Sequence, residues 1–230
     1  MPDRFAYSNA LRDVHPVEKL VFSFSCMVIT LISGSTVVHL MVFMIMAGAV
    51  LFLARIPLGY YVGIMFKAFV FVFLGSAAIA YKAIDLHGAM FVFFRAFAAI
   101  SCFYFLILTT PAADILPVLR KVRMPSIIIE LMGLTYRFIF VFMDITQKTR
   151  TAQSSRLGYD GIKNSYRSMG ILISSLFVRM LRQADYLNTA LESRGFTGEL
   201  NVMQRVFKSS AANIAAITVI DIFLIAIGSG

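Results

Sequence analysis

The sequence has no tryptophan, only two cysteines and few charged residues, and each shortage narrows the class of protein. Charged residues make up 14% of the 230 residues and hydrophobic residues 59%, a balance too apolar for a soluble domain and typical of an integral membrane protein. Both cysteines, Cys26 and Cys102, lie inside apolar runs, so the sequence predicts no disulfide framework. Without tryptophan, tyrosine is left to supply the aromatic side chains at the membrane interface.

Acidic residues are scarce as well, since 12 Asp and Glu stand against 21 Lys and Arg, a net charge of +9. Such a charge can indicate a nucleic-acid-binding protein. Here the basic residues are strongly uneven along the chain, which is typical of the positive-inside distribution of membrane proteins and predicts no nucleic-acid partner. We expect a multi-pass protein of the bacterial cell (inner) membrane with a cytoplasmic N-terminus. The Arg55 region and residues 120–208 would be cytoplasmic, and Asp85 and Gly230 would lie outside.

Long apolar runs predict the membrane-spanning helices. Residues 20–54 contain no Lys, Arg, Asp or Glu. A single helix of that length would measure about 52 Å against about 30 Å of hydrocarbon, so two helices joined by a turn at residues 33–35 fit better. Further spans are predicted at residues 58–81, 89–110 and 209–227. Residues 1–111 would thus form four transmembrane helices, and residues 209–230 the fifth.

The region between them, residues 112–208, carries more charge, and we expect it to lie in the cytoplasm. Its apolar periodicity predicts two long amphipathic helices, over residues 126–156 and 162–194. One apolar face of the second helix should contact another membrane protein or the companion helix, and the spacing does not choose between them. The residues of this face are Leu172, Leu176, Met180, Leu187 and Leu191. The predicted fold is an all-α, polytopic membrane protein with a single membrane domain over residues 1–230.

No pattern of catalytic residues is present. The sequence lacks the HExxH motif of metalloproteases, the paired aspartates of prenyltransferases and a phosphate-binding glycine loop, so we predict no enzyme activity and no catalytic residue. His15, His39 and His87 are scattered, and with the two cysteines they reproduce no metal-ligand spacing, so we predict no metal site. Two other classes stay open. A permease would need polar residues lining its spans, and a membrane enzyme would need clustered carboxylates or histidines at the membrane face.

Two charged residues stand inside predicted spans. Charges within a span are costly and tend to be paired or functional. Arg95 and Asp221 each lie about 9 Å from the outer end of a span, which predicts an intramembrane ion pair between them. The alternative is that Arg95 extends outward to the interface while Asp221 faces water.

Two similar motifs end the two long helices, "TAQSSRLGYD" at residues 151–160 and "TALESRGFTG" at residues 189–198. Each contains Ser-Arg and a glycine within the next two residues. One explanation is helix capping, in which the arginine complements the helix dipole and the glycine ends the helix. The paired occurrence favours docking instead. A guanidinium group forms several directional hydrogen bonds, and therefore suits a pocket lined by carboxylate or carbonyl groups.

With these motifs the chain resembles the transmembrane (T) component of energy-coupling factor (ECF) transporters, most closely the CbiQ type of cobalt uptake systems. The resemblance covers nearly the whole chain. It includes "LRDVHPVEKL" near the N-terminus, four early spans and "LPVLRKVRMP". It continues through two long helices that end in "SSRLG" and "ESRGF", and it closes with a final span.

The resemblance implies a coupling subunit that holds no cofactor and contacts two kinds of partner. Paired ABC-type ATPase subunits would bind ATP and receive the two arginine motifs, and a substrate-capture membrane subunit would pack on the apolar side of the long helices. ATP binding would close the ATPases and move the two arginines together. The docking residues carried over from the family are Ser155, Arg156 and Leu157, and Ser193, Arg194 and Gly195. Leu157 departs from the family pattern, in which a small residue is frequent. Cobalt ion is the implied substrate, with nickel or a vitamin as alternatives.

Overall fold

The computed structural model describes residues 3–83, 86–195 and 211–228. Every regular element in these ranges is a helix, which confirms the predicted all-α fold. The chain divides into two compact units, one within residues 1–118 and 205–230 and the other within residues 119–204. Asp85 and Gly230, predicted to lie outside the membrane, fall outside the described residues.

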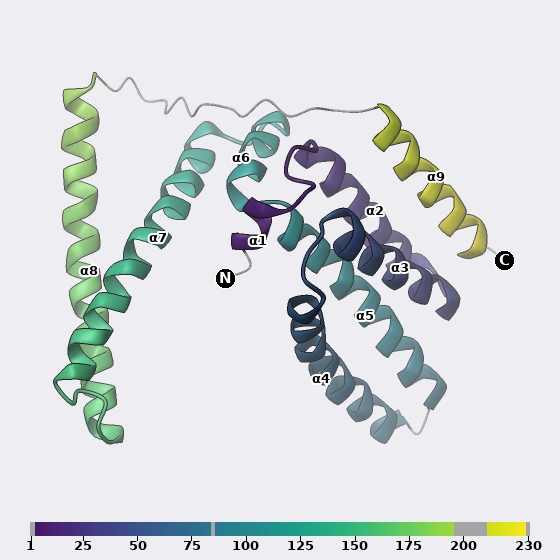
Figure 1. The fold of residues 1–230 in the computed structure, drawn as a ribbon, viewed down its shortest axis with the longest axis horizontal. Helices are drawn as coiled ribbons and strands as arrows, with labels where there is room; N and C mark the ends of the chain where they lie inside the picture. The colour runs from purple at the N-terminus through teal and green to yellow at the C-terminus, as the bar shows by residue number, and fades with distance from the viewer. Residues whose placement is uncertain (1–2, 84–85, 196–210, 229–230) are drawn as a thin grey trace. The chain divides into compact units, whose positions relative to one another are not determined.

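The first unit is a bundle of apolar helices (Figure 1). Its helices are α1 (Asp3–Ser8), α2 (Pro16–Ile32), α3 (Thr36–Gly48), the π-helical turn η1 (Ala49–Leu53), α4 (Leu58–Ala83), α5 (Leu86–Thr109) and α9 (Ala211–Gly228). The break between α2 and α3 confirms the predicted turn at residues 33–35. Helix α5 is central, since it packs against α2, α3 and α4, while α9 packs against α2 and α3.

Local signals fix the start of α2. The ring nitrogen Nδ1 of His15 accepts a hydrogen bond from the Val17 N–H at 3.1 Å. Pro16 occupies the first helical position, where its missing N–H would have had no partner in the helix. The "HP" of the N-terminal segment therefore acts as a helix start.

Apolar side chains fill the bundle, and the polar groups among them bind helix ends. The carbonyl groups in the last turn of α5 have no partner within their own helix. Lys19 Nζ donates to the Thr109 carbonyl oxygen at 3.0 Å, and Asn9 Nδ2 donates to the same oxygen at 3.2 Å. A cation at a helix C-terminus also complements the helix dipole. These contacts hold the N-terminal segment against the end of α5. Fully buried apolar residues of the bundle include Cys26, Val42, Met46, Cys102 and Leu108.

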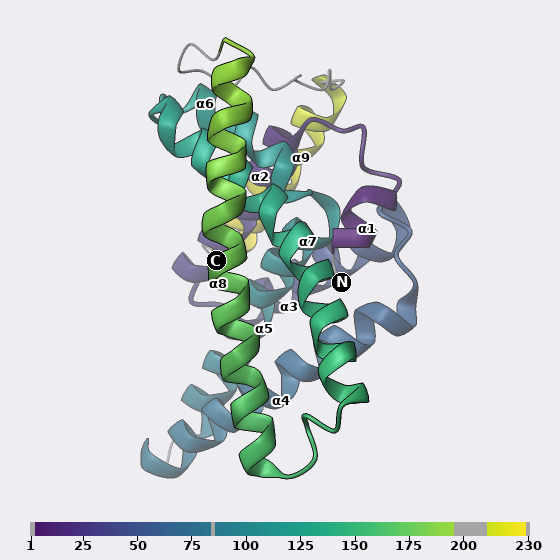
Figure 2. The same cartoon turned by 90° about the vertical axis from the view of Figure 1, so that its left-hand side faces the viewer.

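The second unit is a helical hairpin with almost no interior. It consists of α7 (Ser126–Ser155) and α8 (Ile162–Ser193), which pack against each other and confirm the two predicted long helices (Figures 1 and 2). A shorter helix, α6 (Ala112–Lys121), precedes them. Within the fully described α7 and α8, Ser168 is the one buried residue. The hairpin thus lacks a hydrophobic core of its own.

Both units contain helices that are long and apolar enough to cross a membrane. By length and composition, four stretches of the described chain can do so, at residues 36–53, 58–81, 87–109 and 126–155. Residues 213–228 form a shorter apolar helix. Helix α7 is the unexpected member of the set, because we had assigned residues 112–208 to the cytoplasm. Helix α8 does not belong to it.

Candidate partner-docking motifs

The two Ser-Arg motifs end α7 and α8 with the same hydrogen-bonding pattern. The first motif is residues 151–160, and the second motif is described over residues 189–195, since residues 196–198 lie outside the described residues. In the first motif, Ser155 Oγ donates to the Thr151 carbonyl oxygen at 3.0 Å. In the second motif, Ser193 Oγ donates to the Thr189 carbonyl oxygen at 2.9 Å. Each serine hydroxyl therefore bonds back to its own helix.

The arginines share one backbone conformation. Arg156 has φ −101° and ψ 19°, and Arg194 has φ −95° and ψ 8°. The following residue is left-handed in both motifs, with φ 57° at Leu157 and 68° at Gly195. Each left-handed residue donates its N–H to the carbonyl oxygen three residues back at 3.0 Å, as in a Schellman motif. The two helix ends are thus local copies of each other.

The glycines of the two motifs nevertheless have different roles. The capping explanation expects glycine at the left-handed position, and Gly195 occupies it. In the first motif Leu157 holds that position, which costs a residue with a side chain about 1–2 kcal/mol. Gly158 comes one residue later, where a β-carbon would lie 2.7 Å from Ser168 Oγ. Gly158 therefore permits the close approach of α8 and does not supply the left-handed residue of the cap.

Side chains on both sides of the turn connect the first motif to α8. Gln153 Nε2 donates to the Ser168 carbonyl oxygen at 3.0 Å, and the Tyr159 hydroxyl donates to Gln153 Oε1 at 2.8 Å. Ser168 Oγ returns a hydrogen bond to the Gly158 carbonyl oxygen at 2.6 Å. No pattern in the sequence indicates the roles of Gln153 and Ser168, because a contact across the turn depends on how the two helices pack. The first motif is consequently held in place by its neighbours.

The arginine side chains of both motifs are exposed. Neither Arg156 nor Arg194 forms a hydrogen bond or an ion pair through its side chain with any residue that the structure describes. Arg156 precedes α8 and Arg194 follows it, and α8 is one uninterrupted helix of 32 residues (Figure 2). At 1.5 Å per residue, about 48 Å therefore separates the two ends of α8. Two guanidinium groups so far apart cannot enter one pocket.

The predicted apolar face of α8 is only partly open. Met180 is exposed, and so are its neighbours on the helix surface Ile173 and Phe177. The other four predicted residues are half-buried, namely Leu172, Leu176, Leu187 and Leu191. The side chains most accessible to a partner are therefore Met180, Ile173 and Phe177.

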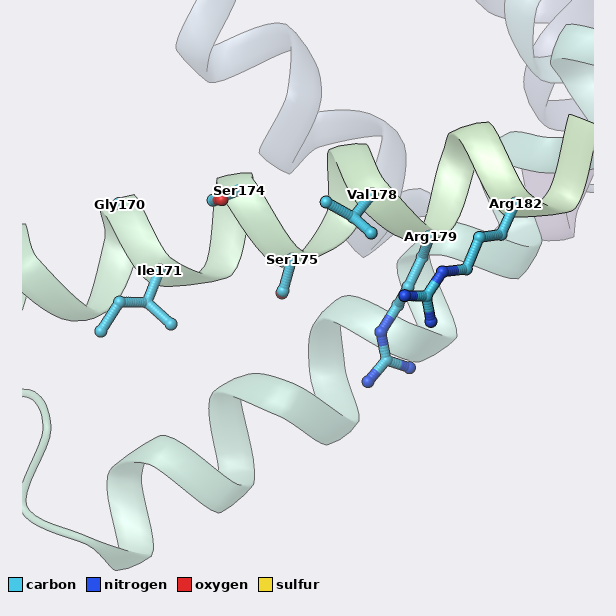
Figure 3. Close-up of a pocket in the computed structure, with 7 residues that line it drawn as sticks. All are labelled: Gly170, Ile171, Ser174, Ser175, Val178, Arg179 and Arg182. Atoms are coloured by element: carbon cyan, nitrogen blue, oxygen red, sulfur yellow. The ribbon is translucent and has the colours of Figure 1, made fainter.

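A shallow groove of about 500 Å³ lies on α8 (Figure 3). Small residues make room for it, and the side chains of Arg179 and Arg182 extend toward the same side of the helix. All the lining residues belong to α8, namely Gly170, Ile171, Ser174, Ser175, Val178, Arg179 and Arg182. The groove is thus a feature of the helix surface, without the carboxylate, histidine or cysteine that acid–base or nucleophilic chemistry would use. Among the described residues, no group of three or more His, Cys, Asp or Glu could hold a metal ion.

The predicted ion pair between Arg95 and Asp221 is not formed. Arg95 donates from Nη2 to the Leu31 carbonyl oxygen, which lies in the last turn of α2 and has no partner within that helix. Asp221 Oδ1 accepts from Ser25 Oγ at 3.0 Å. Since Ser25 and Leu31 are six residues apart on one helix, their levels differ by about 9 Å. The two charges therefore lie at different heights, contrary to the equal depths that we inferred from the sequence.

A family match covers most of the chain, including α2 to α8 and both motifs. Residues 7–205 match the family CbiQ, described as cobalt transport protein. The chain belongs to the CbiQ family. Membership confirms the resemblance that we drew from the motifs, and it identifies the bundle and the hairpin as parts of a membrane transport protein of this family.

Three relatives show how far the similarity extends. An uncharacterised protein of Methanocaldococcus jannaschii is 32% identical over an alignment 243 residues long, gaps included. The alignment covers 97% of this chain and 90% of that protein. The cobalt transport protein CbiQ of Rhodobacter capsulatus is 36% identical over 120 residues, 52% of this chain and 49% of its own length. The energy-coupling factor transporter transmembrane protein EcfT of Lactococcus lactis is 33% identical over 125 residues, with coverages of 50% and 47%. The chain spans about half the length of these two named transport proteins, whose similarity supports a transmembrane component of the ECF type.

Proposed function

We propose that this chain is the coupling subunit of an ATP-driven, ECF-type importer that takes up cobalt ions. Arg156 and Arg194 would each dock on one of two paired ABC-type ATPase subunits, and those subunits would bind ATP. The observation that supports this most directly is the pair of exposed guanidinium groups, free of side-chain partners in the described chain, at opposite ends of α8. A paired partner explains why the same helix ending occurs twice.

The chemistry of arginine fits this role. A guanidinium group is permanently charged, and its planar set of N–H donors can bind a carboxylate through two parallel hydrogen bonds. Removal of such a group from a buried contact leaves the partner's charge unpaired and costs about 2–5 kcal/mol of binding free energy. An arginine that only complements a helix dipole contributes about 0.3–1 kcal/mol. The two explanations therefore differ enough to be separated by measurement.

The positions of the two motifs favour an α8 that lies along the membrane surface. If α8 crossed the membrane, Arg156 and Arg194 would be on opposite sides, and only one of them could reach a cytoplasmic ATPase. The composition of α8, which does not qualify as a membrane span, agrees with this placement. We assign the N-terminus and both motifs to the cytoplasm, because the basic residues concentrate around them.

The apolar side of α8 is our candidate surface for the substrate-capture membrane subunit. The exposed residues Ile173, Phe177 and Met180 would make the first contacts. The half-buried part of the face would join after a small rearrangement of the hairpin, through Leu172, Leu176, Leu187 and Leu191. The capture subunit would carry the ion, and the family description favours cobalt over nickel or a vitamin.

The test uses full-length protein in membranes together with the ATPase and capture subunits of the same transport system. Arg156→Ala, Arg194→Ala and the double variant are compared at equal membrane levels for binding of purified ATPase and for ATP-driven cobalt uptake. Each single change should weaken ATPase binding by about 2–5 kcal/mol, and the double change should abolish uptake. Lysine variants should restore little, because lysine keeps the charge but loses the planar donors.

Arg182→Ala is the matched control, since Arg182 is also an exposed arginine but lies within the length of α8 and not at its end. It should bind ATPase as the unchanged protein does. Full uptake by the double-alanine protein would contradict the proposed function and leave both arginines as helix caps. Uptake of nickel in place of cobalt would change the substrate but not the coupling role.

A further inference from the structure

Two turns of the chain have the sequence Arg-X-Pro, at residues 55–57 and 123–125. The arginine is left-handed in both, with φ 53° at Arg55 and 62° at Arg123. In both turns the proline carbonyl oxygen accepts a hydrogen bond from the N–H three residues later, at 3.0 Å in the first and 3.1 Å in the second. These two Arg-X-Pro turns therefore share one construction, and each is followed directly by a helix, α4 or α7.

Arginine is an unfavourable residue for the left-handed position of these turns. A left-handed residue and then a proline commonly follow the end of a helix, but the left-handed residue is usually glycine. A side chain at this position crowds the backbone. Among the described residues other than glycine, only Leu157 shares the conformation with Arg55 and Arg123. Since glycine would form both turns with less strain, the reason for arginine lies in its guanidinium group.

Both guanidinium groups are available to a ligand. Arg55 and Arg123 are exposed, and neither forms a side-chain hydrogen bond or ion pair within the described part of the chain. The backbone beside Arg55 is nevertheless fixed, because Ala54 and Ile56 are buried and the Ile56 N–H donates to the Val50 carbonyl oxygen at 3.3 Å. The first turn thus holds a free cation on an ordered backbone, which lowers the entropy cost of binding.

Apolar surroundings indicate which ligand these cations meet. Arg55 lies between two stretches that are long and apolar enough to cross a membrane, residues 36–53 and 58–81. Arg123 lies three residues before a third such stretch, residues 126–155. A cation at the end of an apolar helix lies at the level of the lipid headgroups. Exposed apolar side chains flank both arginines, namely Phe52, Leu53, Leu58, Val122, Met124 and Ile127.

We propose that the two Arg-X-Pro turns bind the phosphate groups of anionic phospholipids. The planar donors of a guanidinium group match phosphate oxygens, and the exposed apolar neighbours would contact the acyl chains. We predict that both turns face the cytoplasm, whose membrane leaflet carries the anionic lipids. Each bound lipid would fix the depth at which α4 or α7 begins. The inference goes beyond the proposed function, since it requires neither an ATPase nor a transported ion.

The test measures how tightly the full-length protein, without partner subunits, retains phosphatidylglycerol in phosphatidylcholine nanodiscs. Arg55→Gly and Arg123→Gly should each weaken phosphatidylglycerol binding by about 5-fold, and the double variant by about 25-fold. Lysine variants keep the charge and should bind within about 3-fold of the unchanged protein. Because glycine suits the turn, amide hydrogen exchange at Ile56 in Arg55→Gly should be no faster than in the unchanged protein. Weaker lipid binding with an intact turn would separate a ligand-binding role from a structural one.

Lys148→Ala is the matched control, because it removes one positive charge that already has a partner, Asp144 at 2.6 Å. It should change phosphatidylglycerol binding by less than about 2-fold. An equal loss in Lys148→Ala would reduce the effect to net charge and overturn the two sites, as would unchanged binding in the double glycine variant. Release of phosphatidylglycerol by inorganic phosphate at equal ionic strength would also overturn them, by identifying free phosphate as the ligand. Glycine variants that keep the lipid but lose purified ATPase would assign the turns to a protein partner instead.

Discussion

The helical bundle and the α7–α8 hairpin differ in where their apolar side chains go. In the bundle, residues such as Met46 and Leu108 are completely buried. In the hairpin, Ser168 is the one buried residue, while side chains as large as Phe177 stay exposed. Isolated helices gain most of their stability from tertiary packing, so a hairpin with no core depends on lipid or a partner. Substitutions in the bundle should therefore change stability, and those in the hairpin should change assembly.

The largest effect is expected from a cavity in the bundle. Leu108→Ala removes a side chain that is 0% exposed and should lower the free energy of unfolding by about 2–5 kcal/mol. Phe177→Ala removes a larger side chain from an exposed site and should change stability by less than about 0.5 kcal/mol. Thermal unfolding of both variants in detergent measures the difference. Equal destabilisation by the two changes would erase the distinction between the units.

A smaller effect is expected at the turn of the hairpin. In Gly158→Ala the new β-carbon would lie 2.7 Å from Ser168 Oγ and 2.8 Å from the Gln153 carbonyl oxygen. The contact with the backbone oxygen cannot be relieved by a rotamer change, so the turn should lose about 1–3 kcal/mol. Hydrogen exchange should increase around residues 153–168 and stay unchanged in α2 and α5. Protection that falls equally in the bundle would show that the units do not respond separately.

The smallest effect is expected between Arg95 and Asp221. Since these residues bind different levels of α2, the stability changes of Arg95→Leu and Asp221→Leu should add to within about 0.5 kcal/mol in the double variant. Thermal unfolding of the two single variants and the double variant gives the coupling energy directly. A double variant more stable than either single one would restore the ion pair that the sequence suggested.

These cases show what the sequence could predict. The turn at residues 33–35 follows from the length of the uncharged run at residues 20–54, and the two long helices α7 and α8 follow from their apolar periodicity, which acts within a few positions of the chain. The partners of Arg95 and Asp221 depend on the relative heights of α2, α5 and α9. The spacing of residues along one helix does not determine these heights. The role of Gly158 depends in the same way on the approach of Ser168 from α8. The two motifs and their arginines can therefore be found in the sequence. The hydrogen bonds that join Gln153 and Gly158 to Ser168 are visible only in the structure.

In the proposed function, the uninterrupted course of α8 limits how paired ATPase subunits would move this chain. The resemblance implied that the two arginines move together, yet a continuous helix of 32 residues is a strut whose length of about 48 Å does not shorten. A rigid helix moves as one body, so it transmits displacement by sliding along its axis or by tilting. A tilt of about 10° with the first motif as pivot would carry Arg194 through an arc of about 8 Å. For a given tilt, the displacement of Arg194 is proportional to the length of α8. One added turn would lengthen the helix by about 5.4 Å.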